Sequence, residues 1–254
     1  MLKISIIKCL TDNYSYLIRD EETNLVGVVD PSEFTTVDEA INENYKKLDF
    51  ILNTHHHFDH VGGNQKLKEK YNSKVVASKI DKSRIPGINI ELNEGDVFKF
   101  GKTNFKILFI PGHTKGHIAF YSKSEKTIFT GDTLFSLGCG KIFEGTHQQM
   151  FDSLNKIKNL PVSTKIYCGH EYTKKNLEFC IKYEKNNKYL PKKLHWIDAQ
   201  LNKKKPTVPI SIEEELKTNI FLRCNEPSLK NDLGMNNEPD EVIFKKLRDL
   251  KDEF

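Results

Sequence analysis

The chain has 254 residues, of which 37% are hydrophobic and 29% are charged. This length and composition can bury one sizeable core and a small satellite domain. The 39 basic and 35 acidic residues leave a net charge of only +4, so we expect no nucleic-acid partner, which would select a broad basic face. No apolar stretch approaches the ~20 residues of a membrane span, and we expect no membrane partner.

The cysteines indicate a reducing environment. Five cysteines occur, an odd number, and none forms a C-x-x-C pair. Free thiols in this pattern are typical of intracellular proteins, so we expect a cytoplasmic location. Residues 2–10 are predicted to form the first strand rather than a signal peptide, because Lys3 and Lys8 interrupt the apolar run.

The predicted elements divide the chain into two parts. Up to residue 172, strands and helices alternate with glycine turns, and beyond it the strand signals fade. We therefore expect an α/β catalytic domain at 1–172 and a helical substrate-binding domain at 173–254. In chain order, strands are predicted at 2–10, 50–53, 105–110 and 127–130 and just before Cys168, and helices at 64–71, 174–185, 192–204, 213–217 and 239–251. Trp196 has leucine and isoleucine neighbours at helical spacing, so we expect it in the core.

Residues 54–60, Thr-His-His-His-Phe-Asp-His, are the most informative segment of the chain. His55, His57, Asp59 and His60 place four potential metal ligands within six positions, directly after the predicted strand 50–53. In extended backbone His55 and His57 point the same way, and a turn can bring Asp59 and His60 to a second, adjacent point. A solvated histidine loop is the alternative interpretation.

Three later strand ends supply further ligands and argue for a metal centre. His113, Asp132 and His170 each follow a glycine at the end of a predicted strand, where glycine permits a tight turn. Seven nitrogen and oxygen ligands predict two metal ions per chain, with Zn²⁺ favoured and Fe or Mn as substitutes. Such metals lower the pKa of bound water to roughly 7 and so generate a nucleophile at neutral pH.

These motifs resemble the metallo-β-lactamase superfamily. Within it the chain resembles the glyoxalase II (hydroxyacylglutathione hydrolase) family over essentially its whole length. The closer match comes from Thr-Asp-Asn-Tyr at 11–14, Gly-Cys-Gly-Lys at 138–141, Cys-Gly-His-Glu-Tyr at 168–172 and a terminal Arg248 and Lys251. The resemblance implies an α/β fold, an αββα sandwich of two mixed sheets followed by an all-helical domain. It also implies a ligand set: His55, His57 and His113 on one metal, Asp59, His60 and His170 on the other, and Asp132 bridging.

The implied activity is hydrolysis of S-2-hydroxyacylglutathione thioesters by a hydroxide that bridges the metals. S-D-lactoylglutathione is the leading substrate, and the reaction would be the second step of methylglyoxal detoxification. Asp132 would act as the bridge and Asp59 as a proton acceptor. The family positions that would hold glutathione correspond here to Lys141, Phe143, His170, Tyr172, Arg248 and Lys251. Phe143 stands where the family usually has Tyr.

The residues support part of this interpretation on their own. Arg248 and Lys251 lie three positions apart on a predicted helix, so they share a face, and they suit the two carboxylates of glutathione. The alternative is that they only complement the helix dipole. Two other activities stay open: a mononuclear-iron glutathione persulfide dioxygenase and a metal-dependent nuclease that processes nucleic acid.

Four histidines are not expected to be ligands. We expect His56 to point away from the metals and His117 to hydrogen-bond a ligand residue. His147 and His195 are predicted to be structural or exposed.

Overall fold

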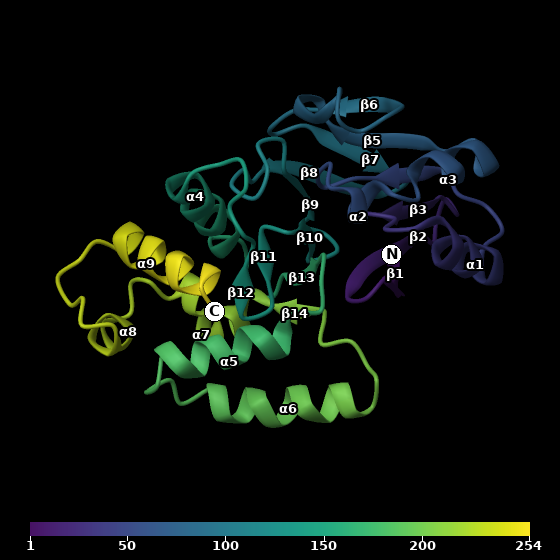
Figure 1. The fold of residues 1–254 in the computed structure, drawn as a ribbon. Coiled ribbons are helices and arrows are strands. Elements are labelled where there is room, and N and C mark those ends of the chain that lie inside the picture. The colour runs from purple at the N-terminus through teal and green to yellow at the C-terminus, as the bar shows by residue number, and fades with distance from the viewer.

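The computed structural model describes residues 1–254 and contains two six-stranded sheets that pack face to face (Figure 1). In the first sheet the strands β1 to β3 run antiparallel, and β3 to β6 run parallel. This sheet is therefore mixed. Its strands, in spatial order, are β1 (Leu2–Cys9), β2 (Asn13–Asp20), β3 (Val26–Val29), β4 (Phe50–Leu52), β5 (Lys74–Ser78) and β6 (Ile88–Leu92).

The second sheet is also mixed. Only β10 and β13 pair in parallel, and its other neighbours are antiparallel. Its strands, in spatial order, are β14 (Ile210–Ser211), β13 (Lys165–Cys168), β10 (Thr127–Gly131), β9 (Ile118–Ser122), β8 (Thr103–Phe109) and β7 (Val97–Phe100). A separate two-stranded hairpin joins β11 (Leu134–Phe135) to β12 (Gly138–Cys139). The fold-class prediction is confirmed.

Helices cover both outer faces of the sandwich (Figure 1). In the first part of the chain they are α1 (Phe34–Asn44), α2 (Phe58–Val61), α3 (Asn64–Tyr71), the short 3₁₀ helix η1 (Lys79–Asp81) and α4 (His147–Lys158). The C-terminal part holds α5 (Thr173–Tyr183), α6 (Leu190–Asn202), α7 (Ile212–Thr218), η2 (Ile220–Leu222), α8 (Pro227–Asp232) and α9 (Asp240–Asp252). No helix is long and apolar enough to cross a bilayer.

The buried residues follow the alternation expected of strands and the periodicity expected of helices. β8 alternates buried and exposed residues along its first half, as expected for a strand with one inward face. Between the sheets, Tyr16 and Phe129 meet at a ring-centroid distance of 5.4 Å, and Phe105 is fully buried beside them. Each such side chain contributes roughly 1.5–3 kcal/mol by burial. On the outer faces, Ile41 of α1 packs on the first sheet and Leu154 of α4 on the second.

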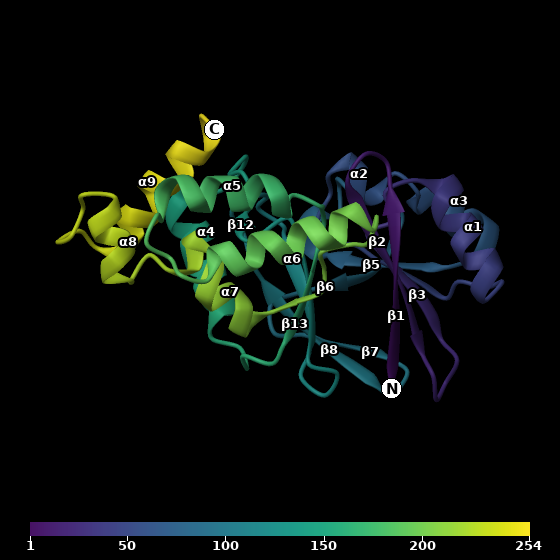
Figure 2. The same ribbon diagram turned by 90° about the horizontal axis from the view of Figure 1, so that it is seen from below.

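The C-terminal helices form a layer beside the second sheet, with α5 and α6 lying next to each other (Figure 2). The predicted helices at 174–185, 192–204, 213–217 and 239–251 are present within about two residues of their predicted ends. The prediction that Trp196 is a core residue is wrong, because α6 turns Ile197 inward and leaves Trp196 37% exposed. It lines an open cavity of about 330 Å³ between α6 and α7, where the Lys193 ammonium lies 4.4 Å from its ring centroid.

Candidate metal centre

Strand ends from both sheets meet at one edge of the sandwich and carry all seven predicted ligands. His55 and His57 follow β4, and Asp59 and His60 lie on α2 directly after them. The other three come from the second sheet: His113 follows β8, Asp132 follows β10 and His170 follows β13. The local reason is the one expected from the sequence, since each strand stops and a turn presents the next polar side chain.

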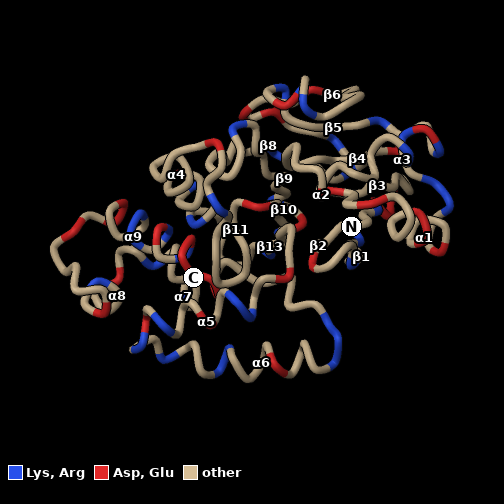
Figure 3. The backbone as a smooth tube through the Cα atoms, in the orientation of Figure 1, with Lys and Arg blue, Asp and Glu red and all other residues tan.

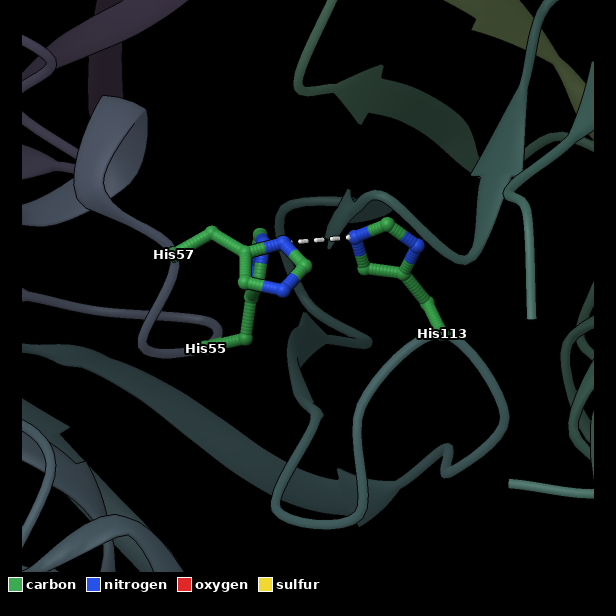
Figure 4. A group of neighbouring side chains, drawn as sticks. All are labelled: His55, His57 and His113. Atoms are coloured by element: carbon green, nitrogen blue, oxygen red, sulfur yellow. Dashed lines mark hydrogen bonds between the residues drawn. The ribbon is translucent and has the colours of Figure 1, made fainter. Parts of the chain in front are cut away.

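The first ligand group contains three imidazoles, which face one another in Figure 4. The ligand atoms of His55, His57 and His113 lie within 4.8 Å of one another, and His57 Nδ1 is 3.0 Å from His113 Nε2. His55 Nε2 is buried without a hydrogen-bond partner. Burial lowers the pKa of all three rings, to about 4 for His57, so these rings are neutral, the form that binds a metal.

The second group contains Asp59, His60 and His170, whose ligand atoms also lie within 4.8 Å of one another. His60 Nε2 and His170 Nε2 face each other at 3.3 Å. Asp132 lies between the two groups: its carboxylate is 3.5 Å from His113 Nε2 and 3.2 Å from His170 Nε2. Converging lone pairs around a shared carboxylate fit a pair of cations.

Electrostatics favour positive charge at this point. Burial alone would raise the pKa of Asp132, but positive charge on the facing imidazoles of His60 and His170 holds it well below its usual value, and the carboxylate in turn raises the pKa of both rings against the effect of their burial. Asp132 Oδ1 is buried and has no donor in hydrogen-bond geometry. An ionised, buried and partly unpaired carboxylate is costly unless a cation compensates it. The donor set therefore suits divalent metal ions.

A second layer of contacts orients the ligand rings. His60 Nδ1 lies 3.1 Å from Asp30, His170 Nδ1 lies 2.8 Å from Asp12, and His113 Nδ1 lies 2.7 Å from the Lys141 carbonyl oxygen. Such partners fix which ring nitrogen faces the metal. Asp30 also groups with His55 and His60, but its carboxylate already accepts two hydrogen bonds from Thr54.

Asp12 and Asp30 were not predicted to take part. Asp30 follows strand β3 directly, so the strand-end pattern that marked the ligands would have found it. Asp12 lies in the Thr-Asp-Asn-Tyr motif, where Asn13 also contributes: its side-chain amide donates to the Asp59 carboxylate at 2.9 Å. Spacing alone does not distinguish ligands from the residues that orient them.

The other histidines behave as expected. His117 Nε2 accepts a hydrogen bond from the Asp132 backbone N–H at 3.1 Å. His56 faces Asp81 and Glu144, at 3.5 and 3.6 Å, and belongs to neither ligand group. His147 is partly exposed and pairs with Asp249, and His195 is exposed.

The metal centre opens into a cavity of about 320 Å³. Four of the predicted substrate residues line it: Lys141, Phe143, His170 and Tyr172. Tyr172 stacks on His170 at 4.7 Å. Phe143 is 61% exposed at the mouth and presents its ring to His57 and His113 at 5.6 and 5.3 Å.

Arg248 and Lys251 do not line this cavity. Arg248 is only 4% exposed, and its guanidinium donates to the Cys139 carbonyl at 2.9 Å and to Asp252 at 2.9 Å. The Lys251 ammonium is half-buried and lies 4.9 Å from the ring centroid of Phe179.

Comparison with known proteins agrees with this geometry. The Metallo-beta-lactamase superfamily matches residues 10–170, and the family described as Hydroxyacylglutathione hydrolase C-terminus matches 171–254. The chain is 53% identical to the hydroxyacylglutathione hydrolase of Pelagibacter ubique, with 100% of both chains covered. It is 42% identical to that of a Chelativorans species, covering 100% of this chain and 99% of the other.

A solved structure supports the fold. The crystal structure of ETHE1 from Myxococcus xanthus aligns with a TM-score of 0.71 at 23% identity, covering 98% of this chain and 91% of that one. Taken together with the two ligand groups and their shared aspartate, these matches show that the chain belongs to the hydroxyacylglutathione hydrolase (glyoxalase II) family of the metallo-β-lactamase superfamily.

Proposed function

We propose that the protein hydrolyses S-2-hydroxyacylglutathione thioesters to glutathione and a 2-hydroxy acid, with S-D-lactoylglutathione as the leading substrate. This would be the second step of methylglyoxal detoxification. The observation that carries the proposal is a cavity lined at its base by members of both ligand groups and at its mouth by Lys141 and Phe143. Full-length relatives that bear the name of this activity support it.

We propose that the two groups hold two divalent ions, Zn²⁺ first, with Fe or Mn as alternatives. When bound, such ions lower the pKa of a coordinated water to roughly 7 and polarise the thioester carbonyl. Asp132 sets the spacing of the two groups, and Asp59, held by Asn13, is placed to accept a proton. The leaving thiolate, whose conjugate acid has a pKa of about 8.5, departs without a protonating side chain.

The substrate contacts are divided between the two parts of the chain. We propose that Lys141, Tyr172, Phe143 and His170 bind the cavity end of the thioester. Lys251, on the helical part, then suits a glutathione carboxylate. Arg248 was expected to share that role, but its Nη1 and Nη2 groups already donate to protein acceptors and its Nε is buried, which favours an indirect role.

We further propose that residues 1–172 carry the metals and 173–254 shape the glutathione end. One contact complicates this boundary, since β14 of the second part extends the second sheet. We also propose a cytoplasmic location, which the five free and buried cysteines support, because a reducing compartment keeps thiols unpaired.

The alternatives have less support. A mononuclear-iron dioxygenase needs one ligand group, whereas both are formed here around Asp132. A nuclease would need a continuous basic face, whereas Figure 3 shows basic and acidic residues interspersed along the chain.

The test is thioester hydrolysis by the purified protein, followed by thiol release and paired with metal analysis. We expect about two metal ions per chain, turnover of S-D-lactoylglutathione, loss of turnover on chelation and recovery with Zn²⁺. An acyl thioester without the glutathione carboxylates serves as the control and should have a higher KM. A metal-replete protein that releases no thiol from either substrate would refute the proposal.

A further inference from the structure

The segment 132–141 touches the metal centre at both of its ends. Asp132 begins it, and the Lys141 carbonyl that orients the His113 ring at 2.7 Å ends it. The two ends are tied together, because the Gly140 N–H donates to the Thr133 carbonyl. The two ends are packed so closely that only glycine fits at position 140: a Cβ on Gly140 would lie 1.9 Å from the Asp132 carbonyl oxygen. The placement of this segment therefore sets the positions of Asp132 and of the His113 ring.

The middle of the segment is the β11–β12 hairpin, which has no sheet neighbour. In Figure 1 it lies against the C-terminal helices. Its buried carbonyls must find other donors, because an unpaired buried carbonyl costs stability. All six consecutive carbonyls of residues 135–140 accept from side chains of the C-terminal part. The donors are Asn219 to Phe135 and Gly138 (3.3 and 3.1 Å), Asn176 to Ser136 (3.0 Å), the Cys180 thiol to Leu137 (3.3 Å), and Arg248 to Cys139 and Gly140 (2.9 and 3.4 Å).

Arg248 holds the end of the hairpin that leads into Lys141. Its Nη1 is shared between two carbonyls, its Nη2 pairs with Asp252 one turn later, and its carbon lies 5.4 Å from the ring centroid of Phe221. Charge-assisted donors in a planar fork fix the direction of their acceptors. These contacts direct the guanidinium at the backbone of the hairpin.

We propose that Asn176, Asn219 and Arg248 are positioning residues of the metal centre, which hold the 135–140 backbone so that Asp132 and His113 reach their metal-binding positions. This inference rests on the proposed metal centre and gives the helical part a role in assembling it. Arg248 then acts on the substrate only through the hairpin.

The test compares Zn²⁺ affinity, measured on apo protein by competition with a chromophoric chelator, with kcat and KM for S-D-lactoylglutathione. Arg248→Met keeps the packing on Phe221 but removes the donors. We expect it to weaken Zn²⁺ binding and to lower kcat, each by at least about tenfold, the usual range for residues that orient ligands. Arg248→Lys, which restores one charged donor, should recover part of both losses.

Two control variants lie on the same helix. Lys246 is exposed, so Lys246→Met should leave Zn²⁺ affinity, kcat and KM at wild-type values. Lys251→Met removes a proposed substrate contact and should raise KM without changing Zn²⁺ affinity.

A direct role of Arg248 in substrate binding gives the opposite pattern. If Arg248→Met raises only KM and keeps wild-type Zn²⁺ affinity and kcat, the inference is overturned. If that variant does not fold, Asn176→Ala, which removes only the Ser136 contact, decides by the same affinity measurement: a loss supports the inference and wild-type affinity overturns it. Zn²⁺ affinity is independent of thioester hydrolysis, so a wrong substrate would not affect this test.

Discussion

Asp132 lies between the two ligand groups. It lies within 3.5 Å of imidazoles from each group, and its other oxygen has no hydrogen-bond donor. We predict that Asp132→Ala lowers kcat at least about 10²-fold, because the electrostatic arrangement that stabilises the transition state loses its centre. Kinetics with metal analysis measure this. His195→Ala, an exposed substitution, should change nothing, and near wild-type turnover in a metal-loaded Asp132→Ala would contradict the role of Asp132.

Phe143 is the one departure from the family pattern within the cavity lining. Its ring is largely exposed and already lies above the metal centre, so a para hydroxyl has room to reach a bound substrate. We predict that Phe143→Tyr lowers KM by up to about tenfold, as one added hydrogen bond worth ~1 kcal/mol allows. Phe143→Leu, measured beside it, separates the hydroxyl from the ring. An unchanged or higher KM for Phe143→Tyr would show that the position does not donate to substrate.

At the level of elements, strand ends explain why most of the site was predictable. A strand, a glycine and a polar residue recur before His113, Asp132 and His170, and parallel or neighbouring strands present such ends at one edge of a sheet. This pattern and the 54–60 segment located the seven candidate ligands, whereas their division into two groups was implied by the family resemblance and also requires the two sheets to bring their ends together. Helix periodicity likewise located α5, α6, α7 and α9.

Other features depend on long-range contacts that no local pattern encodes. The donors to the 135–140 carbonyls lie 40 or more positions from their acceptors along the chain, so no short sequence window contains both partners. The prediction that Trp196 is a core residue failed for a related reason. The contact between α6 and α5 sets the rotation of α6, which leaves the Trp196 ring exposed. The contact of Arg248, on α9, with the β11–β12 hairpin rather than with the cavity could not be predicted from its spacing to Lys251.

On helix α9, the charge of Lys251 should make the KM depend on pH. Burial, followed by repulsion from Arg248, lowers the pKa of Lys251 from 10.5 to about 8; the ammonium also faces Lys175 and two buried cysteines. Its charge is therefore lost as the pH rises above 8. We predict that KM for S-D-lactoylglutathione rises between pH 7 and pH 9, and that Lys251→Met has a KM at least about tenfold higher at pH 7, since one charge-assisted contact is lost.

The control for α9 is an acyl thioester without glutathione carboxylates, whose KM should be insensitive to Lys251→Met at every pH. The glutathione carboxylate that Lys251 is proposed to bind is remote from the thioester, so Lys251→Met should change kcat little. Equal KM values for wild type and Lys251→Met with the glutathione substrate would remove Lys251 from the binding site.

At the scale of the whole molecule, the two parts of the chain are joined by buried polar groups. β14 extends the second sheet, and the hairpin beside the metal centre is held from the helical side. Glu215 of α7 belongs to this junction: its carboxylate accepts from the Leu137 backbone N–H and from the Asn219 amide, both at 2.8 Å. Folding of the two parts is therefore expected to be cooperative.

Glu215 should make the stability of that junction depend on pH. Burial raises the pKa of its carboxyl from 4.5 to about 7, although Lys193 and two hydrogen bonds oppose the shift. Between these values the folded protein binds more protons than the unfolded chain, so the free energy of unfolding falls as the pH rises. The contribution is fully present below pH 4.5 and lost above pH 7.

We predict that Glu215→Gln, which keeps an acceptor for Leu137 and Asn219 but cannot ionise, removes this dependence. Relative to wild type, its free energy of unfolding should increase by about 2 to 3 kcal/mol from pH 5 to pH 8, measured by denaturant titration at matched metal content. Glu213→Gln, on an exposed face of the same helix, should show no such change. Parallel pH profiles for Glu215→Gln and wild type would mean that the Glu215 carboxyl ionises normally and that hydration reaches the junction between the two parts.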